Sequence, residues 1–175
     1  LLNHSISCED AIRSFHLDPQ KKTVLILGGS LGARTINQCV IENIAKIKES
    51  GVQFIWQTGK IYINDAIAAI ANAGDVTMLH VTDFISNMAA AYSAADLVIS
   101  RAGAGSISEF CLLEKPVILV PSPNVAEDHQ TKNALALVNK NAALYVKDAN
   151  ARDELIDKAI QTVNQSDLLN NLSIN

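Results

Sequence analysis

The stretch ADLVISRAGAGSISEF, residues 95–110, decides the fold class of this chain. It begins with a short apolar run, turns through two glycines and continues into a helix-forming segment. A glycine-rich turn between a strand and a helix is a common place for a phosphate group. A second turn of this kind, LGGSLGA at 27–33, follows an apolar run upstream. The sequence therefore predicts strand–turn–helix units whose turns bind an anion.

The same alternation of apolar runs and helical segments continues along the chain. The runs are apolar throughout instead of alternating with polar residues, which is typical of strands covered on both faces. The pattern predicts an α/β fold, a Rossmann-like doubly wound parallel sheet of about six strands with helices on both faces. The predicted strands are 23–28, 52–58, 76–81, 96–100, 116–121 and 142–146, and the predicted helices are 34–49, 62–73, 86–95, 106–114, 128–140 and 151–163.

The 175 residues are enough for one domain with a core of its own. We place this domain at residues 21–165, after a linker-proximal segment at 1–20. Residues 166–175 are polar and weakly periodic, and they are predicted to be a frayed or truncated tail. The chain starts LLNHS without a methionine, which suggests a piece of a longer protein.

The composition argues against several classes of partner. A net charge of −4 without a cluster of lysines and arginines disfavours nucleic acid and anionic lipid. Three widely spaced cysteines indicate a reducing compartment, and the sequence has neither a signal-peptide pattern nor an apolar run of about 18 residues. We expect a cytoplasmic domain. The sequence also lacks an Asp-x-Asp pair for a metal-bound diphosphate, so no metal or other cofactor is predicted.

Neither glycine turn matches a dinucleotide or triphosphate motif. The later turn has Ser108 where a dinucleotide fingerprint has its third glycine, and the acid expected about 20 residues on is missing. The earlier turn lacks the Gly-x-Gly spacing, and no Gly-Lys-Ser/Thr follows either turn. General anion binding at a helix N-terminus remains, with Gly103 and Gly105 allowing close approach and Ser106 adding a hydroxyl.

Two further segments have more than one interpretation. Ser106 and Glu109 have the spacing of a capping box, so Glu109 is either a helix-capping residue or a ligand of neutral hydroxyl groups such as those of a ribose. Gln130 and Asn133 lie three apart on one helix face, where their amides suit a sugar. The alternative for that segment is a solvated first turn, and His129 is either a base or polar surface.

Three segments carry a resemblance to a known family: GGSLGA at 28–33, HVTDFISNMAAAYSAADLVISRAGAGSISE at 80–109, and DHQTKNA at 128–134. Together they resemble the C-terminal half of the MurG family, the glycosyltransferase family 28 enzymes that add N-acetylglucosamine during peptidoglycan synthesis. The resemblance implies the GT-B architecture, in which two Rossmann-like domains face each other across a cleft. The C-terminal domain binds UDP-N-acetylglucosamine (UDP-GlcNAc). The N-terminal domain, expected before Leu1, receives the lipid-linked acceptor, lipid I, at the cytoplasmic face of the membrane.

The resemblance also assigns roles to residues of this chain. Gly29 and Ser30 would approach the nucleotide diphosphate, and Phe84 and Ile85 would flank the uracil, with the Ile85 backbone reading its edge. The remaining implied contacts are with the diphosphate (Gly103, Ala104, Gly105, Ser106), the ribose (Glu109) and the N-acetylglucosamine (His129, Gln130, Asn133). No catalytic residue is expected in this chain, because the base would lie in the N-terminal domain.

The resemblance implies the donor-binding domain of an inverting transferase that converts lipid I to lipid II. Any membrane contact would belong to the full-length protein, peripheral at the inner membrane. Two alternatives keep the fold: a stand-alone nucleotide-sugar-binding subunit that needs a partner chain, and a UDP-sugar 2-epimerase domain. A dehydrogenase-type domain is disfavoured by the glycine turns.

Overall fold

The predicted strands form one sheet in the computed structural model of the chain, which describes residues 6–29, 33–74 and 76–174. Every strand pairing is parallel, and the order across the sheet is β3-β2-β1-β4-β5-β6. The order reverses between β1 and β4, which is the switch point of a doubly wound fold. The strands are β1 (Thr23–Leu27), β2 (Gln53–Gln57), β3 (Leu79–Thr82), β4 (Leu97–Ser100), β5 (Val117–Leu119) and β6 (Leu144–Tyr145).

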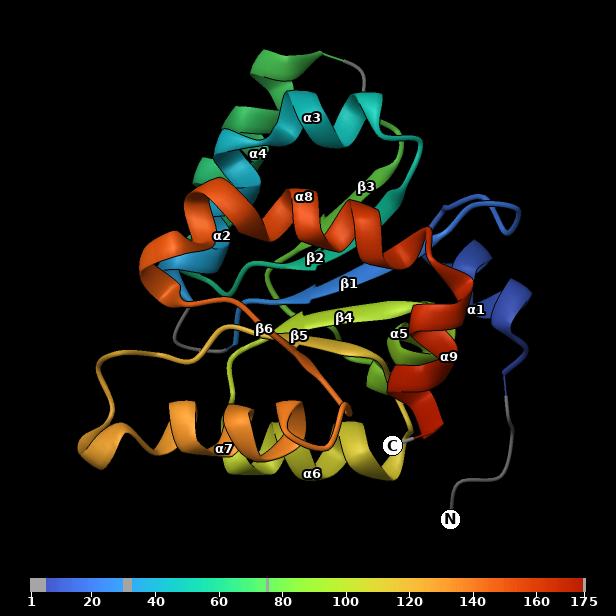
Figure 1. Ribbon diagram of the computed structural model, residues 1–175. Coiled ribbons are helices and arrows are strands. Elements are labelled where there is room, and N and C mark those ends of the chain that lie inside the picture. The colour runs from blue at the N-terminus through green and yellow to red at the C-terminus, as the bar shows by residue number, and fades with distance from the viewer. Residues whose placement is uncertain (1–5, 30–32, 75, 175) are drawn as a thin grey trace.

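Helices cover both faces of the sheet, as predicted (Figure 1). Neighbouring residues of one strand enter different cores, because successive side chains point to opposite faces. Val24 and Ile26 join one core cluster, and Leu25 joins the other. Helices α2 (Arg34–Glu42), α3 (Ile44–Glu49), α4 (Ile63–Ala73) and α8 (Ala151–Val163) supply the first cluster, and α1 (Cys8–Ser14), α5 (Met88–Ala94), α6 (Ala104–Leu112) and α7 (His129–Val138) supply the second. Short 3₁₀ turns, η1 (Ala126–Asp128) and η2 (Asp148–Asn150), precede α7 and α8.

Some helices and strands begin or end at residues other than those predicted. The helix predicted over 34–49 breaks at Asn43, whose side-chain amide donates to the carbonyl of Cys39 at 2.8 Å. The strand predicted from 76 begins at Leu79, after a turn. The helix predicted from 106 begins at Ala104, two residues earlier, and this shift changes the interpretation of Glu109.

The tail prediction is wrong for residues 166–174, which form helix α9 (Ser166–Ile174). Leu169 and Leu172 are buried although the segment is mostly polar, because a three-residue spacing places both on one helix face. Near the other terminus, α1 packs against α5 and buries Ala11 and Ile12. Within the described residues, no helix combines the length and the apolar character that a membrane span requires.

Candidate functional site

The loops at the carboxyl ends of the strands surround a solvent-open cleft of about 950 Å³ at the switch point. Parallel sheets of this topology bind ligands at this position. Residues from the β1–α2, β4–α6 and β5–α7 connections line the cleft, and Asp148 adds a carboxylate from the segment after β6. The lining comprises Gly28, Gly29, Ala33, Arg34, Thr35, Arg101, Ser122, Pro123, Asn124, Gln130 and Asp148. We call this the switch-point cleft.

The first glycine turn begins at the floor of this cleft. The Gly28 amide donates to the carbonyl of Gln57 at 2.7 Å, and a Cβ at Gly28 would lie 2.6 Å from the same oxygen. Only glycine allows this approach of the two backbones. Gly29 adopts a φ of 68° and lines the cleft. Ser30, predicted to approach the diphosphate, lies outside the described residues.

The second glycine turn ends at Gly103, the residue that precedes the first turn of α6. Ala104, Gly105 and Ser106 form that turn, so their amide groups have no acceptor within the helix. A Cβ built on Gly103 or on Gly105 would meet no atom within 4 Å, which shows open space at this helix end. Unpaired amides and the helix dipole favour an anion here. We call residues 103–106 the helix-end site.

The capping-box interpretation of Glu109 is wrong. Because Gly103 is the N-cap residue, Ser106 already lies inside the helix, and Glu109 lies too far along it to reach the unpaired amides. Its Oε2 instead accepts a hydrogen bond from the hydroxyl of Tyr92 on α5, at 2.7 Å. Burial and the nearby carboxylate raise the pKa of Tyr92, so this hydroxyl stays protonated and remains a donor. Glu109 is exposed and can present its other oxygen to a ligand.

Phe84 and Ile85 border a second cavity, of about 690 Å³, beside Phe15 and His80. Phe84 is 64% exposed, so its ring can stack on a planar ligand, whereas Ile85 is buried. The Ile85 amide donates to Oε1 of Gln57 at 3.2 Å. The structure therefore already pairs the amide of Ile85, which leaves its carbonyl as the backbone group for the edge of a base.

The side-chain amides of Gln130 and Asn133, on α7, hold the loop that leads into the helix-end site. Oε1 of Gln130 accepts from the backbone amides of Ala102 at 3.2 Å and of Ser122 at 2.9 Å. Asn133 donates from Nδ2 to the carbonyl of Ala102 at 3.2 Å. The solvated-turn alternative therefore does not describe these two side chains. His129 is exposed, with its Nε2 3.5 Å from a Glu127 oxygen.

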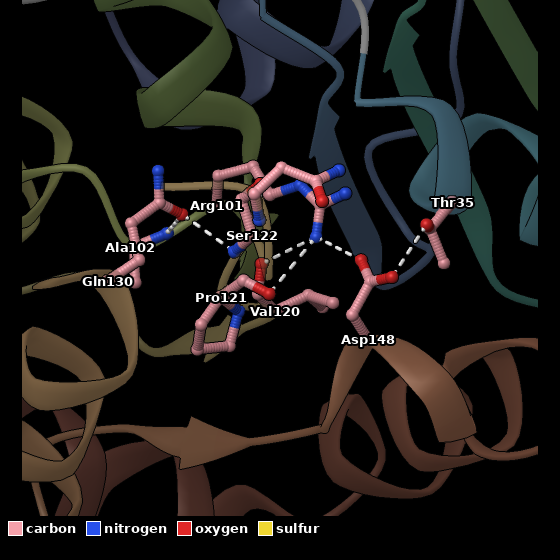
Figure 2. A network of polar contacts seen from close by, with 9 residues as sticks. Thr35, Arg101, Ala102, Val120, Pro121, Ser122, Gln130 and Asp148 are labelled. Atoms are coloured by element: carbon pink, nitrogen blue, oxygen red, sulfur yellow. Dashed lines mark hydrogen bonds and ion pairs between the residues drawn. The ribbon is translucent and has the colours of Figure 1, made fainter. Parts of the chain in front are cut away.

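Arg101 connects several of these loops and was not among the predicted site residues (Figure 2). Its Nη1 donates to the carbonyls of Val120 at 3.1 Å and Pro121 at 3.3 Å, and it forms an ion pair with Asp148. The other oxygen of Asp148 accepts from the hydroxyl of Thr35 at 2.9 Å. We call these five residues the Arg101 network. The only feature of the sequence that points to this network is an arginine directly after a predicted strand.

Similarity to known proteins identifies the family of this chain. A sequence profile of the glycosyltransferase family 28 C-terminal domain matches residues 23–173. The chain belongs to glycosyltransferase family 28. The family 28 profile spans all six strands of the sheet, both glycine turns and most of α9.

Two relatives with high identity carry the same name. A protein of Phocaeicola vulgatus is 77% identical over the whole chain, and one of Parabacteroides distasonis is 55% identical over 95% of it. Both are named UDP-N-acetylglucosamine--N-acetylmuramyl-(pentapeptide) pyrophosphoryl-undecaprenol N-acetylglucosamine transferase. This family 28 chain covers 46% and 45% of their lengths, so it spans slightly less than half of each.

Solved structures give the same architecture. MurG of Acinetobacter baumannii superposes with a TM-score of 0.76 at 29% identity, over 97% of this chain and 48% of that one. The glycosyltransferase WaaG superposes with a TM-score of 0.71 at 18% identity, over 99% of this chain and 46% of that one, and this match supports the fold alone. The family 28 chain therefore has the fold of one half of a GT-B glycosyltransferase.

The structure brings most of the predicted family 28 site residues to one edge of the sheet. Gly29 and Gln130 line the switch-point cleft, and Asn133 and Gln130 hold the loop before Gly103. Phe84 and Ile85 lie at the separate cavity beside α5. Four other residues hold site loops or site residues but have no local sequence signal: Thr35, Asp148, Gln57 and Tyr92.

Proposed function

We propose that this chain is the donor-binding half of an inverting glycosyltransferase that transfers N-acetylglucosamine from UDP-GlcNAc to lipid I, giving lipid II. The observation that carries the proposal is that a chain of family 28 has an open, glycine-lined helix end at the switch point of its sheet. The names of relatives at up to 77% identity support the choice of substrates.

In the proposed complex the nucleotide extends from the second cavity to the helix-end site. The uracil stacks on the exposed ring of Phe84, next to Ile85, and the free oxygen of Glu109 accepts from the ribose hydroxyls. The amides of the helix-end site bind the diphosphate, together with the Ser106 hydroxyl, Gly29 and Ser30. The sugar reaches Gln130, Asn133 and His129 at the start of α7.

The proposed reaction is a single displacement. A hydroxyl oxygen of the muramic acid of lipid I attacks the anomeric carbon of the donor, and its proton passes to a base outside this chain. The bond between that carbon and the diphosphate oxygen breaks, UDP leaves, and the new linkage is β. Negative charge grows on the leaving diphosphate, and the first turn of α6 is already oriented to stabilise it. Loss of one such contact typically costs roughly 3 kcal/mol of barrier, or about 100-fold in rate.

We propose that donor binding needs no metal. Among the described residues, no group of three or more histidines, cysteines, aspartates and glutamates is arranged to hold an ion. The helix-end amides supply the positive potential that a metal supplies in other transferases. We further propose that the full-length protein is cytoplasmic and peripheral at the inner membrane, with its lipid contact outside this chain.

Thermal unfolding with candidate ligands tests the proposal. UDP or UDP-GlcNAc at about 100 times its dissociation constant should stabilise the protein by roughly 2.7 kcal/mol, and NAD should not. Stabilisation by NAD without stabilisation by UDP would exclude the proposal. The isolated chain should bind donor but transfer no sugar to lipid I, whereas the full-length protein should do both. Formation of UDP-N-acetylmannosamine by the full-length protein, without transfer, would favour the 2-epimerase alternative. Activity that requires a second polypeptide would favour the stand-alone subunit.

A further inference from the structure

The Arg101 network connects the segments that follow four strands, across the point where the sheet order reverses. At the switch point, the helices that follow β1 and β4 leave to opposite faces of the sheet, which opens the crevice between the two loops. Thr35 follows β1, Arg101 follows β4, Val120 and Pro121 follow β5, and Asp148 follows β6. The side-chain contacts of the network therefore run across the ends of four neighbouring strands (Figure 2).

Acceptors from the protein already surround Nη1 of Arg101. Nη1 carries two hydrogens and has three acceptors, the carbonyls of Val120 and Pro121 and the carboxylate of Asp148. The side chains of Arg101 and Asp148 are only 21% and 20% exposed, so the pair is partly shielded from water. A planar guanidinium presents its donors in a fixed geometry, so the segments that supply these acceptors are held in one arrangement.

The carboxylate of Asp148 fixes both arms of the network. One oxygen pairs with Arg101, and the other accepts from Thr35 in the first turn of α2. Asp148 also begins η2, directly before α8, where a negative charge is favoured by the helix dipole. Because Asp148 cancels the charge of Arg101, the pair adds little net positive charge to the switch-point cleft.

We propose that the Arg101 network positions the helix-end site for the diphosphate, with Asp148 as its central positioning residue. This inference rests on the proposed function. Arg101 immediately precedes Ala102, whose amide and carbonyl are held by Gln130 and Asn133, and Gly103 follows. A displaced Arg101 backbone therefore displaces the first turn of α6. In this role Arg101 acts through loop geometry and does not serve as the charge partner of the phosphates.

The substitution Asp148→Asn separates positioning from direct charge contact, because the two predict opposite signs. If Arg101 bound the diphosphate directly, loss of the Asp148 charge would free the guanidinium and strengthen UDP binding. If the network positions the helix-end site, the same substitution weakens UDP binding by about 10-fold, the value of one hydrogen bond to a charged group. Affinity for uridine, which lacks phosphate, should stay unchanged.

The experiment is calorimetric titration of the full-length protein with UDP and with uridine. Asp157→Asn is the matched control, because it removes the same charge and breaks the ion pair with Lys46, and Asp157 does not line the cleft. It should leave both affinities unchanged. Thr35→Val removes only the α2 arm and should weaken UDP binding by about threefold. It carries the test if Asp148→Asn does not fold.

The outcomes separate the two proposals. If the unsubstituted protein binds no UDP, the proposed function fails and the positioning role fails with it. If it binds UDP while Asp148→Asn and Thr35→Val bind it equally well or more tightly, only the positioning role is overturned. An equal loss of affinity for UDP and uridine would show general loosening of the domain and would also overturn it.

Discussion

The hydroxyl of Tyr92 on α5 donates to Oε2 of Glu109 on α6 at 2.7 Å, and this bond orients the carboxylate that we assign to the ribose. The Tyr92 ring is buried and packs edge-on against Phe110, so the donor is rigidly placed. One helix thus presents a ligand-binding side chain that a second helix holds in position.

Tyr92→Phe should weaken UDP binding by about 3- to 10-fold, because it removes one hydrogen bond to a charged group. The ring and its contact with Phe110 remain, so the loss in the free energy of unfolding should be limited to this hydrogen bond, about 1.5–3 kcal/mol. Titration with UDP and urea unfolding measure the two effects. A loss of stability with unchanged affinity would show that Tyr92 supports only the packing of α5 on α6.

Glu109→Gln should lower UDP affinity by about 10-fold or more, since an amide is a weaker acceptor for ribose hydroxyls. Because Glu109 is not a cap, the melting temperature of the free protein should stay within a few degrees of its starting value. The control is Glu154→Gln, an exposed position in the first turn of α8. It should leave UDP affinity unchanged and lower stability by no more than about 1 kcal/mol, the value of a favourable charge in the first turn of a helix.

Two glycine-to-alanine substitutions should have opposite effects on stability. A Cβ at Gly105 meets no atom within 4 Å, and alanine favours a helix by up to about 1 kcal/mol, so Gly105→Ala should not lower the melting temperature. The helix-end site binds through backbone amides, which this substitution leaves in place, so UDP affinity should change by no more than about threefold. At Gly28 the Cβ would lie 2.6 Å from the Gln57 carbonyl oxygen, and Gly28→Ala should destabilise the fold by about 1–3 kcal/mol. A lower melting temperature in Gly105→Ala, or an unchanged one in Gly28→Ala, would contradict this prediction.

Helix α9 should contribute measurably to stability. Leu169→Ala and Leu172→Ala each remove a buried side chain and should each cost about 2–3 kcal/mol in the free energy of unfolding. Leu112→Ala is the matched control, because that side chain is 82% exposed and should change stability by about 0.5 kcal/mol at most. Equal effects at all three positions in urea unfolding would mean that α9 does not pack in solution.

His80 should make stability depend on pH. Burial, with a smaller effect from His16, lowers the pKa of His80 below its ordinary value of 6.5. The folded protein therefore binds this proton less readily than the unfolded chain, so the contribution is complete above pH 6.5 and is lost as the pH falls through the lowered value. Urea unfolding at descending pH should show a shallower decline for His80→Asn than for the unsubstituted protein. Parallel declines would assign the pH dependence to other groups.

The local pattern of the sequence determined the class of fold. Apolar runs separated by helical segments require strands buried on both faces, and the parallel order places every strand-to-helix loop at one edge. The two glycine turns, Phe84 and the start of α7 could be assigned to that edge for this reason. Helix boundaries carry a weaker sequence signal: α6 begins at Ala104, and its N-cap residue Gly103 has no side chain to mark the start.

Only the tertiary structure decided how the site side chains are held. Glu109 has the spacing of a cap, but its partner is a tyrosine on another helix. Arg101 and Asp148 lie 47 residues apart in the chain, and Thr35 and Asp148 lie 113 apart. Local propensity carries no information on such pairs, because they exist only once the sheet brings the ends of four strands together.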